Sequence, residues 1–197
     1  GEGMYLGCNN DGCQMYDSLI ERNYVHHTNQ ASVAQGDGIE IKQGSYNNIV
    51  RDNVIHDTNY PCLLIYGTAG KAVNLLERNA MWNCGDHGIQ AEADAIIRNN
   101  LVLGAKADGI RNQNHQQQSV EDLTIVHNTV LNQGDALRSD NIKSNVVIAN
   151  NALYSQNGNA LRASGTLTAL TVAGNVGLGT TQGISGGFTG GGALATD

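Results

Sequence analysis

Three arginines occupy the same place in three short, similar segments: Arg111 in GIRNQ, Arg138 in ALRSD and Arg162 in ALRAS. A guanidinium group binds carboxylates and sulfates well, because its planar fork can donate two parallel hydrogen bonds to such an anion. Acidic residues near them in sequence are candidates to neutralise them, Asp108 for Arg111 and both Asp135 and Asp140 for Arg138. The arginines therefore predict either a salt-bridged surface strip or a site for an acidic polysaccharide.

Two histidines add possible acid–base chemistry. His87 lies in GDHGIQAE, close in sequence to Glu92, and an imidazole titrates near neutral pH. The alternative for His87 is a turn residue bonded to the backbone. His115 lies in the long polar loop 111–122, which is either a sugar-contact loop on a rigid scaffold or an ordinary solvated insertion.

A repeat must position these side chains. Its copies each hold an aliphatic pair, one or two variable residues and an Asn, and the Asn residues are 21 to 30 positions apart: LIERNYV (19–25), IVRDNVI (49–55), LLERNAM (75–81), IIRNNLV (96–102), IVHNTVL (125–131), VIANNAL (147–153) and LTVAGNV (170–176). Such periods are typical of a solenoid. We expect each Asn to adopt the left-handed conformation of a tight bend and to bond to the equivalent Asn in the next turn, as a structural ladder.

A second repeat, out of phase with the first, alternates aliphatic and polar residues as a half-buried strand does, for example in GIEIK (38–42). No segment keeps the 3.6-residue period of a helix for a dozen residues. We therefore predict an all-β parallel β-helix of about seven to eight turns, with three short strands per turn. Residues 1–190 should form a single domain, followed by the Gly-rich end 191–197.

Stacking places outward residues of neighbouring turns about 4.8 Å apart. We expect one inward column to contain Met4, Ile39, Leu64, Ile89, Ile110, Leu137, Leu161 and Ile184. The outward column beside it would contain Tyr5, Glu40, Ile65, Gln90, Arg111, Arg138, Arg162 and Ser185. This alignment predicts a groove over the outward face of strands 38–42 and 109–113.

These repeats resemble the right-handed parallel β-helix repeat family, the pectate lyase-like superfamily that includes alginate and chondroitin lyases, over nearly the whole chain. The segment GDGIEIKQGSYNNIVRDNVI (36–55) is similar to the chondroitinase B and alginate lyase region in which a strand ends in a catalytic Lys. The resemblance implies that Lys42 is the base that removes the proton α to a uronate carboxyl. Where that family has an Arg in the next turn, this chain has Tyr66, which could serve as the proton donor. Pectate lyases bind calcium through outward acids, which makes calcium at Asp37, Glu40 or Glu92 an alternative to the absence of a cofactor.

A further column follows the ladder residues by three positions: His26, His56, Trp82, Leu103, Leu131, Tyr154 and Leu178. If it faces outward, Trp82 and its neighbours could stack on sugar rings or form a protein contact surface. The alternative is that the column faces the core. His26 and His56 lack a third metal ligand in the sequence, so we expect no metal site there.

The four cysteines form two locally sensible pairs, Cys8–Cys13 and Cys62–Cys84. An even count of this kind favours disulfides and an oxidising compartment, with buried free thiols as the alternative. The net charge of −7 disfavours a nucleic-acid partner, and no apolar run approaches the length of a membrane span. The cysteines thus favour a secreted or cell-surface protein. Because the chain opens on a strand and closes on a Gly-rich stretch, we expect a portion of a longer protein, whose ends could support end-to-end or lateral self-association.

Two classes of function remain open. The first is a polysaccharide lyase with catalytic Lys42, Tyr66 and His87. Its substrate-binding residues would be Glu40, Trp82, Glu92, Arg111, His115, Arg138 and Arg162. The second is a non-catalytic module, either glycan-binding or structural. Whether the protein is an enzyme is not decided by its sequence.

Overall fold

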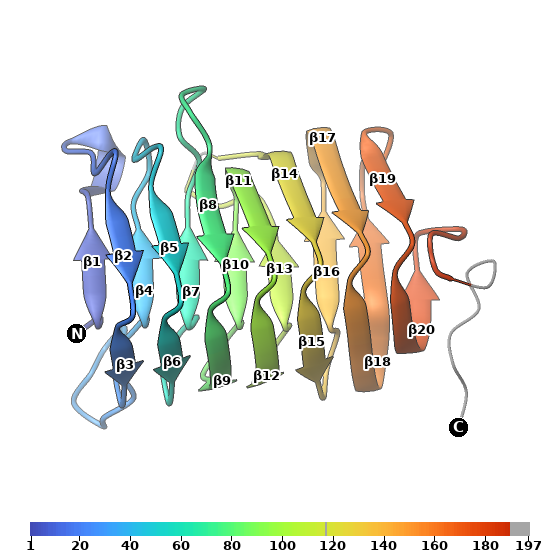
Figure 1. Cartoon of the computed structure of the whole chain (residues 1–197), viewed down its shortest axis with the longest axis horizontal. Helices are drawn as coiled ribbons and strands as arrows, with labels where there is room; N and C mark the ends of the chain where they lie inside the picture. The colour runs from blue at the N-terminus through green and yellow to red at the C-terminus, as the bar shows by residue number, and fades with distance from the viewer. Residues whose placement is uncertain (117, 190–197) are drawn as a thin grey trace.

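Short strands recur three times in each turn of the chain, and equivalent strands of successive turns stack in parallel along one axis (Figure 1). The computed structural model describes residues 1–116 and 118–189, so the expected Gly-rich end 191–197 lies outside the described residues. The all-β parallel solenoid is confirmed. It has about six turns, slightly fewer than expected.

The strands form three faces. The first face consists of β1 (Met4–Leu6), β4 (Ile39–Ile41), β7 (Leu63–Ile65), β10 (Ile89–Ala91), β13 (Ile110–Asn112) and β16 (Leu137–Asp140). The second consists of β2 (Leu19–Glu21), β5 (Ile49–Arg51), β8 (Asn74–Glu77), β11 (Ala93–Arg98), β14 (Val120–Val126), β17 (Ile142–Ala149) and β19 (Leu170–Ala173). The third consists of β3 (Tyr24–His26), β6 (Val54–His56), β9 (Ala80–Cys84), β12 (Leu101–Ala105) and β15 (Thr129–Asn132).

The long strand β18 (Ala152–Ser164) belongs to both the third face and the first, because it pairs with β15 and with β16. Strand β20 (Val176–Gln182) pairs with β18 along both faces. A short 3₁₀ turn, η1 (Asn9–Asp11), precedes β2. Inward aliphatic side chains from all three faces make one continuous core, in which Ile39, Leu76 and Met81 are fully buried. The core is therefore a narrow apolar column along the axis.

The expected register of the first face is wrong at two places. Leu63, not Leu64, pairs with Ile39 and with Ile89, so Leu64 takes the outward position and Ile65 is fully buried. The run LLI gives no apolar–polar alternation from which the phase could be read. At the C-terminal end Thr181 pairs with Leu161, so the predicted members Ile184 and Ser185 lie beyond β20.

The asparagine ladder is confirmed between the second and third faces. Each side-chain amide donates to the Oδ1 atom of the next Asn, at 2.8–3.0 Å, through Asn23, Asn53, Asn79, Asn100, Asn128, Asn151 and Asn175. The same Oδ1 accepts the backbone N–H of the preceding ladder Asn. From Asn53 onward each amide also donates to a backbone carbonyl of the second-face strand in the preceding turn, such as Leu76 for Asn100. The ladder therefore satisfies polar groups that lie inside the stack.

The expectation that the ladder Asn itself is left-handed is wrong. The residue before it takes positive φ, as in Arg22, Asp52, Arg78, Asn99, His127, Asn150 and Gly174. Those residues form the bend at the surface, where Arg and His are tolerated. The Asn that follows is thereby turned inward, with its amide aligned along the stack.

Both predicted disulfides, Cys8–Cys13 and Cys62–Cys84, are present. They are consistent with an extracellular protein. Within the described part of the chain, no helix has the length and apolar character needed to cross a membrane.

The ladder predicts a sharp difference between two adjacent asparagines. Asn100→Asp should lower the free energy of unfolding by at least about 2 kcal/mol, because two donated hydrogen bonds are lost and a carboxylate faces buried acceptors. Asn99→Asp is the matched control, since Asn99 is exposed and Asp also tolerates its positive φ. Urea unfolding would measure both. Equal effects of the two substitutions would contradict a stabilising ladder.

Candidate functional site

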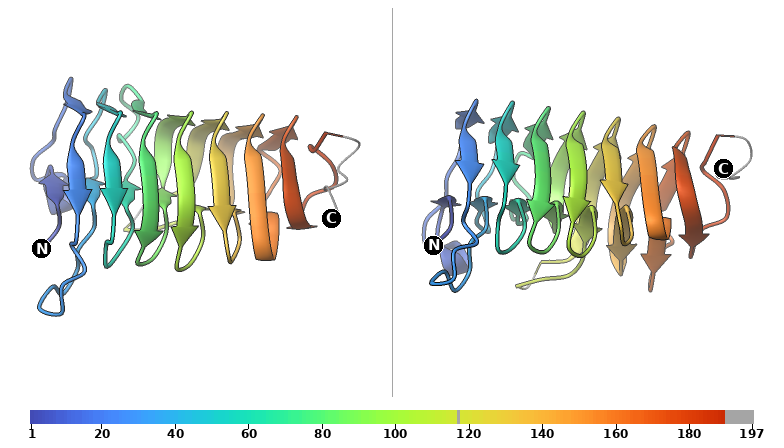
Figure 2. Two further views of the ribbon diagram at one scale, coloured as in Figure 1. Left: turned by 60° about the horizontal axis from the view of Figure 1, so that its bottom comes forward. Right: turned by 90° about the horizontal axis from the view of Figure 1, so that it is seen from below.

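A groove of about 430 Å³ lies on the first face, over β4, β7 and β10. Its floor is formed by outward side chains of successive strands, including Glu40, Leu64 and Gln90. Loops enclose it, and the segment after β13 folds back toward the N-terminal turns and brings His115 to its edge (Figure 2). Of the two strands over which a groove was expected, residues 38–42 contribute Glu40 and Lys42 to the lining, whereas residues 109–113 contribute only Gln113.

Lys42 and Tyr66 meet at one end of this groove. They follow the paired residues Ile41 and Ile65, so stacking places them side by side. The Lys42 side chain is only 3% exposed; its Nζ atom lies 2.7 Å from Glu40 Oε1 and 4.3 Å from the centre of the Tyr66 ring. A carboxylate and an aromatic face both stabilise an ammonium ion. Lys42 is therefore held between a carboxylate partner and an aromatic ring.

The pKa values of Tyr66 and His115 are shifted in opposite directions. Burial, followed by the charges of Glu40 and Glu92, raises the pKa of Tyr66, so its phenol keeps its proton. The His115 ring lies 5.8 Å from the Tyr66 ring, centre to centre, in a stacked orientation. Partial burial, and then the charge of Lys42, lowers the pKa of His115. The pair therefore combines a protonated phenol with a neutral imidazole.

Two carboxyl groups near the groove resist ionisation. Burial and the neighbouring Glu40 raise the pKa of Asp37, which lines the groove, to about 7. Burial raises the pKa of Glu92 to about 8, although the 2.8 Å hydrogen bond from Gln90 opposes the shift. Glu92 is fully buried and does not line the groove. Protonation of these groups reduces the negative charge of the groove near neutral pH.

A cluster of three carboxylates beside the groove could bind a hard cation. Glu2, Asp37 and Glu40 each offer an oxygen, and these atoms lie within 4.8 Å of one another. Among the described residues, Asp37 Oδ1 is buried without a hydrogen-bond partner, which favours a cation. However, calcium takes six to eight oxygen ligands, and Glu40 is already paired with Lys42. Calcium at Asp37 and Glu40 stays a prediction, and Glu92 is not part of this group.

The three arginines stack on the first face as predicted, Arg111 beside Arg138 and Arg138 beside Arg162. Asp140 Oδ2 lies 2.7 Å from Arg111 Nη1 and 2.9 Å from Arg138 Nε. Asp108 lies 3.8 Å from Arg111, as expected, whereas Asp135 contacts Arg162 at 3.7 Å instead of Arg138. The strip is thus salt-bridged, and its arginines lie beyond the groove lining.

His87 is bonded to the backbone, as the alternative for it proposed. Its Nδ1 accepts the Asp108 backbone N–H at 3.2 Å, and burial lowers its pKa to about 4. It precedes β10, whereas Glu92 follows that strand. Asp86 lines the groove but His87 does not, so the structure does not bring His87 to Lys42 and Tyr66.

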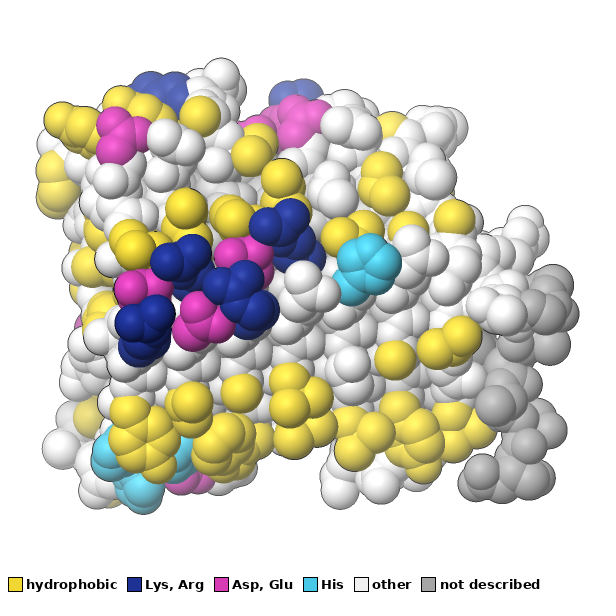
Figure 3. Space-filling model, viewed as in Figure 1, with side chains coloured by type: hydrophobic (Ala, Val, Ile, Leu, Met, Phe, Trp, Pro, Cys, Tyr) yellow, Lys and Arg dark blue, Asp and Glu magenta, His cyan; other side chains and the backbone are white. Residues whose placement is uncertain are grey.

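The column containing Trp82 faces outward on the third face. His26, His56 and Trp82 pair in register, and the His56 and Trp82 rings stack at 4.5 Å. Trp82, Leu103 and Leu131 are exposed, and an apolar band runs along the lower edge of the molecule (Figure 3). Trp82 therefore lies on a different face from the groove.

Sequence reasoning missed a charged network on the second face. Glu21, Arg51, Glu77 and Arg98 alternate in register, with ion pairs of 2.8 Å between Arg51 and Glu21 and 2.7 Å between Arg98 and Glu77. The alternation is visible in the ladder copies LIER, IVRD, LLER and IIRN. This network belongs to the patch of dark blue and magenta side chains in Figure 3. Because opposite charges face each other across neighbouring strands, it stabilises strand pairing.

Comparison with known proteins identifies a family. A family model described as "Right handed beta helix region" matches residues 1–176. No curated protein matches the chain, and no solved structure matches it either.

The raised pKa of Glu92 predicts a pH-dependent stability term. A carboxyl whose folded pKa exceeds its unfolded value stabilises the fold at low pH, and this contribution is lost as pH rises from about 4.5 to about 8. Glu92→Gln removes the ionisable group but keeps an acceptor for Gln90. The melting temperature of the variant relative to wild type should therefore increase between pH 5 and pH 9. A constant difference across that range would show that Glu92 titrates normally.

Proposed function

We propose that this chain, which belongs to the right-handed β-helix family, binds an acidic polysaccharide in its first-face groove and cleaves it by β-elimination at a uronate. One observation carries the proposal. Lys42, Tyr66 and His115 lie together in the groove as an ammonium, a phenol and a neutral imidazole. Two disulfides support an extracellular setting, where such polysaccharides occur.

The reaction requires three kinds of catalytic group: a base, an acid and a group that stabilises negative charge. A base removes the proton on the carbon next to the uronate carboxyl, and the electron pair of that bond forms a carbon–carbon double bond. The bond to the glycosidic oxygen then breaks, and an acid protonates the leaving oxygen. A positive or hydrogen-bonding group stabilises the negative charge on the carboxyl during the step. Atoms and electrons balance without a co-reactant.

His115 and Tyr66 suit the two proton transfers. The lowered pKa of His115 keeps its imidazole free to accept a proton near neutral pH, and the raised pKa of Tyr66 keeps its phenol able to donate one. The resemblance to lyases implied Lys42 as the base. Its ion pair with Glu40 favours a different role for Lys42, in which the ammonium stabilises the developing charge.

Amide side chains suit recognition of the uronate carboxyl. Gln90 and Gln113 line the groove and can donate hydrogen bonds to an anion without adding charge. Asp37, with a pKa of about 7, is largely neutral in mildly acidic solution and can donate a further bond. The groove can therefore accept an acidic sugar although the whole chain carries a net charge of −7.

A second candidate is a non-catalytic glycan-binding module. The specific observation in its favour is the buried ion pair between Lys42 and Glu40, because a fixed, neutral pair can serve as a hydrogen-bonding floor without proton transfer. In this alternative the groove would bind the same acidic glycans but release them unchanged.

Tyr66→Phe tests the lyase. Incubation with alginate, pectate and chondroitin would be followed by the ultraviolet absorbance of the unsaturated product. We expect activity on at least one of these polymers and a loss of roughly 10²-fold or more in kcat for the variant, because the general acid is removed. Tyr154→Phe, on the third face, is the matched control and should keep wild-type activity.

The other outcomes are also informative. Glycan binding with no product from any polymer would support the non-catalytic module and contradict the lyase. New reducing ends without unsaturation would indicate hydrolysis instead of elimination. Absence of both binding and cleavage would contradict both candidates.

A further inference from the structure

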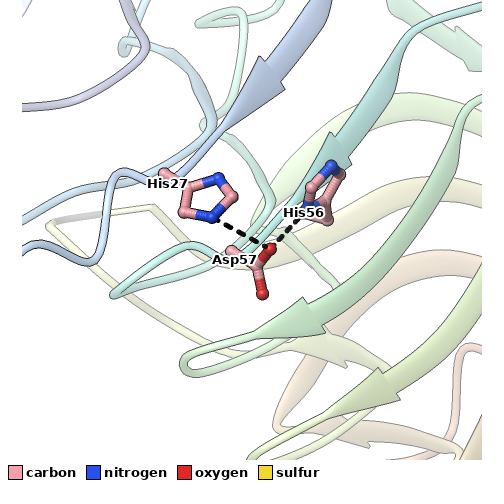
Figure 4. Close-up of side chains that lie close together, drawn as sticks. All are labelled: His27, His56 and Asp57. Carbon is pink, nitrogen blue, oxygen red and sulfur yellow. Dashed lines mark hydrogen bonds and ion pairs between the residues drawn. The ribbon is translucent and has the colours of Figure 1, made fainter.

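The third face ends in a cluster of histidines at its N-terminal turns. Strands β3 and β6 each finish in a histidine, and the pairing places His26 beside His56. The next residue of each turn, His27 and Asp57, has a positive φ of 58° and 54°. This shared bend turns the His27 and Asp57 side chains toward each other, with His56 beside them (Figure 4).

Three donor atoms converge in this cluster. Asp57 Oδ2 lies 2.6 Å from His56 Nδ1 and 3.8 Å from His27 Nε2. All three atoms lie within 4.8 Å of one another. In a tetrahedral site with bonds of about 2.0–2.1 Å, neighbouring ligand atoms are roughly 3.3 Å apart. The observed separations bracket that value, so small side-chain movements would complete the geometry.

The polar atoms of His27, His56 and Asp57 that point away from the centre of the cluster (the outer atoms) are already hydrogen-bonded. His56 Nε2 lies 2.8 Å from the Tyr24 hydroxyl, and His27 Nδ1 lies 2.7 Å from His26 Nδ1. Asn83 donates a hydrogen bond to Asp57 Oδ1. When the outer nitrogen of each imidazole donates its proton to such a partner, the inner nitrogen carries a free lone pair. The second layer of contacts therefore orients His27, His56 and Asp57 as ligands.

We propose that His27, His56 and Asp57 form a binding site for a divalent transition-metal ion of the zinc class. Two imidazole nitrogens and one carboxylate oxygen are the donors that zinc takes in sites with an open fourth position. The nitrogen donors disfavour calcium and magnesium, which prefer oxygen ligands. Binding of the ion breaks the hydrogen bond between His56 Nδ1 and Asp57 Oδ2, and both atoms then face the ion as ligands.

The position of the site suggests what the ion does. His27 and Asp57 begin the two loops that lead to β4 and β7, and these loops contribute Gln35 and Tyr60 to the groove lining. The loops already contact each other, because Asn59 Nδ2 donates to the Gln35 carbonyl at 2.6 Å. An ion at their base ties the two turns together. The site does not depend on cleavage in the groove, since none of its ligands lines the groove.

Calorimetric titration of the chelator-treated full chain with Zn²⁺ tests this proposal, with Co²⁺ absorption as a second probe of the ligand geometry. We expect one ion per chain and a tetrahedral Co²⁺ spectrum. His27→Asn should weaken binding at least tenfold, and Asp57→Asn should do the same. His127→Asn is the matched control, because His127 is also an exposed histidine with positive φ and lies in a distant turn.

Asn tolerates the positive φ of all three positions, so the substitutions preserve the backbone. Circular dichroism would confirm that each variant is folded, and His27→Asn decides the matter if Asp57→Asn is not. Binding that is weakened equally by His27→Asn and His127→Asn would mean scattered surface histidines and would overturn the proposal. Absence of a one-to-one Zn²⁺ complex in the wild-type chain would also overturn it.

Discussion

The register between successive turns is the constraint on which the rest of this structure depends. Each ladder Asn accepts the backbone N–H of the preceding ladder residue and donates to the next one, so a shift by one residue would leave several buried polar groups without partners. The positive-φ residue before each Asn turns that amide inward. Identical bends then repeat at the same place in every turn. Residues that are distant in sequence consequently become neighbours about 4.8 Å apart.

The groove is a direct product of this stacking. Glu40, Leu64 and Gln90 occupy equivalent positions in successive turns, and Lys42 and Tyr66 occupy the next outward column. Burial then gives these side chains their chemical character. It keeps a proton on Tyr66 and on Glu92, while Glu40 and the Tyr66 ring hold the ammonium of Lys42. A rigid scaffold with variable loops thus carries a polar site, and the fold alone does not specify its chemistry.

The sequence allowed prediction of the elements that repeat. The Asn spacing predicted the solenoid and its ladder, and the apolar–polar alternation of GIEIK predicted the first face correctly for most strands. It failed at Leu63 and Leu64, where three aliphatic residues in a row conceal the register. The apolar column through Trp82 was identified, but only the structure shows that it faces outward. His87 could not be placed, because its backbone partner Asp108 belongs to the next turn.

Features that arise between turns could not be predicted from one segment at a time. His115 reaches Tyr66 through a long loop whose path no local pattern reveals, and His27 meets Asp57 because two bends coincide.

We propose above all that the first-face groove binds an acidic polysaccharide. A crystal structure with a short uronate oligosaccharide tests this binding directly, and the sugar should lie across β4, β7 and β10, in contact with Tyr66 and His115. Density for the sugar on the apolar third face beside Trp82, with the groove empty, would contradict it.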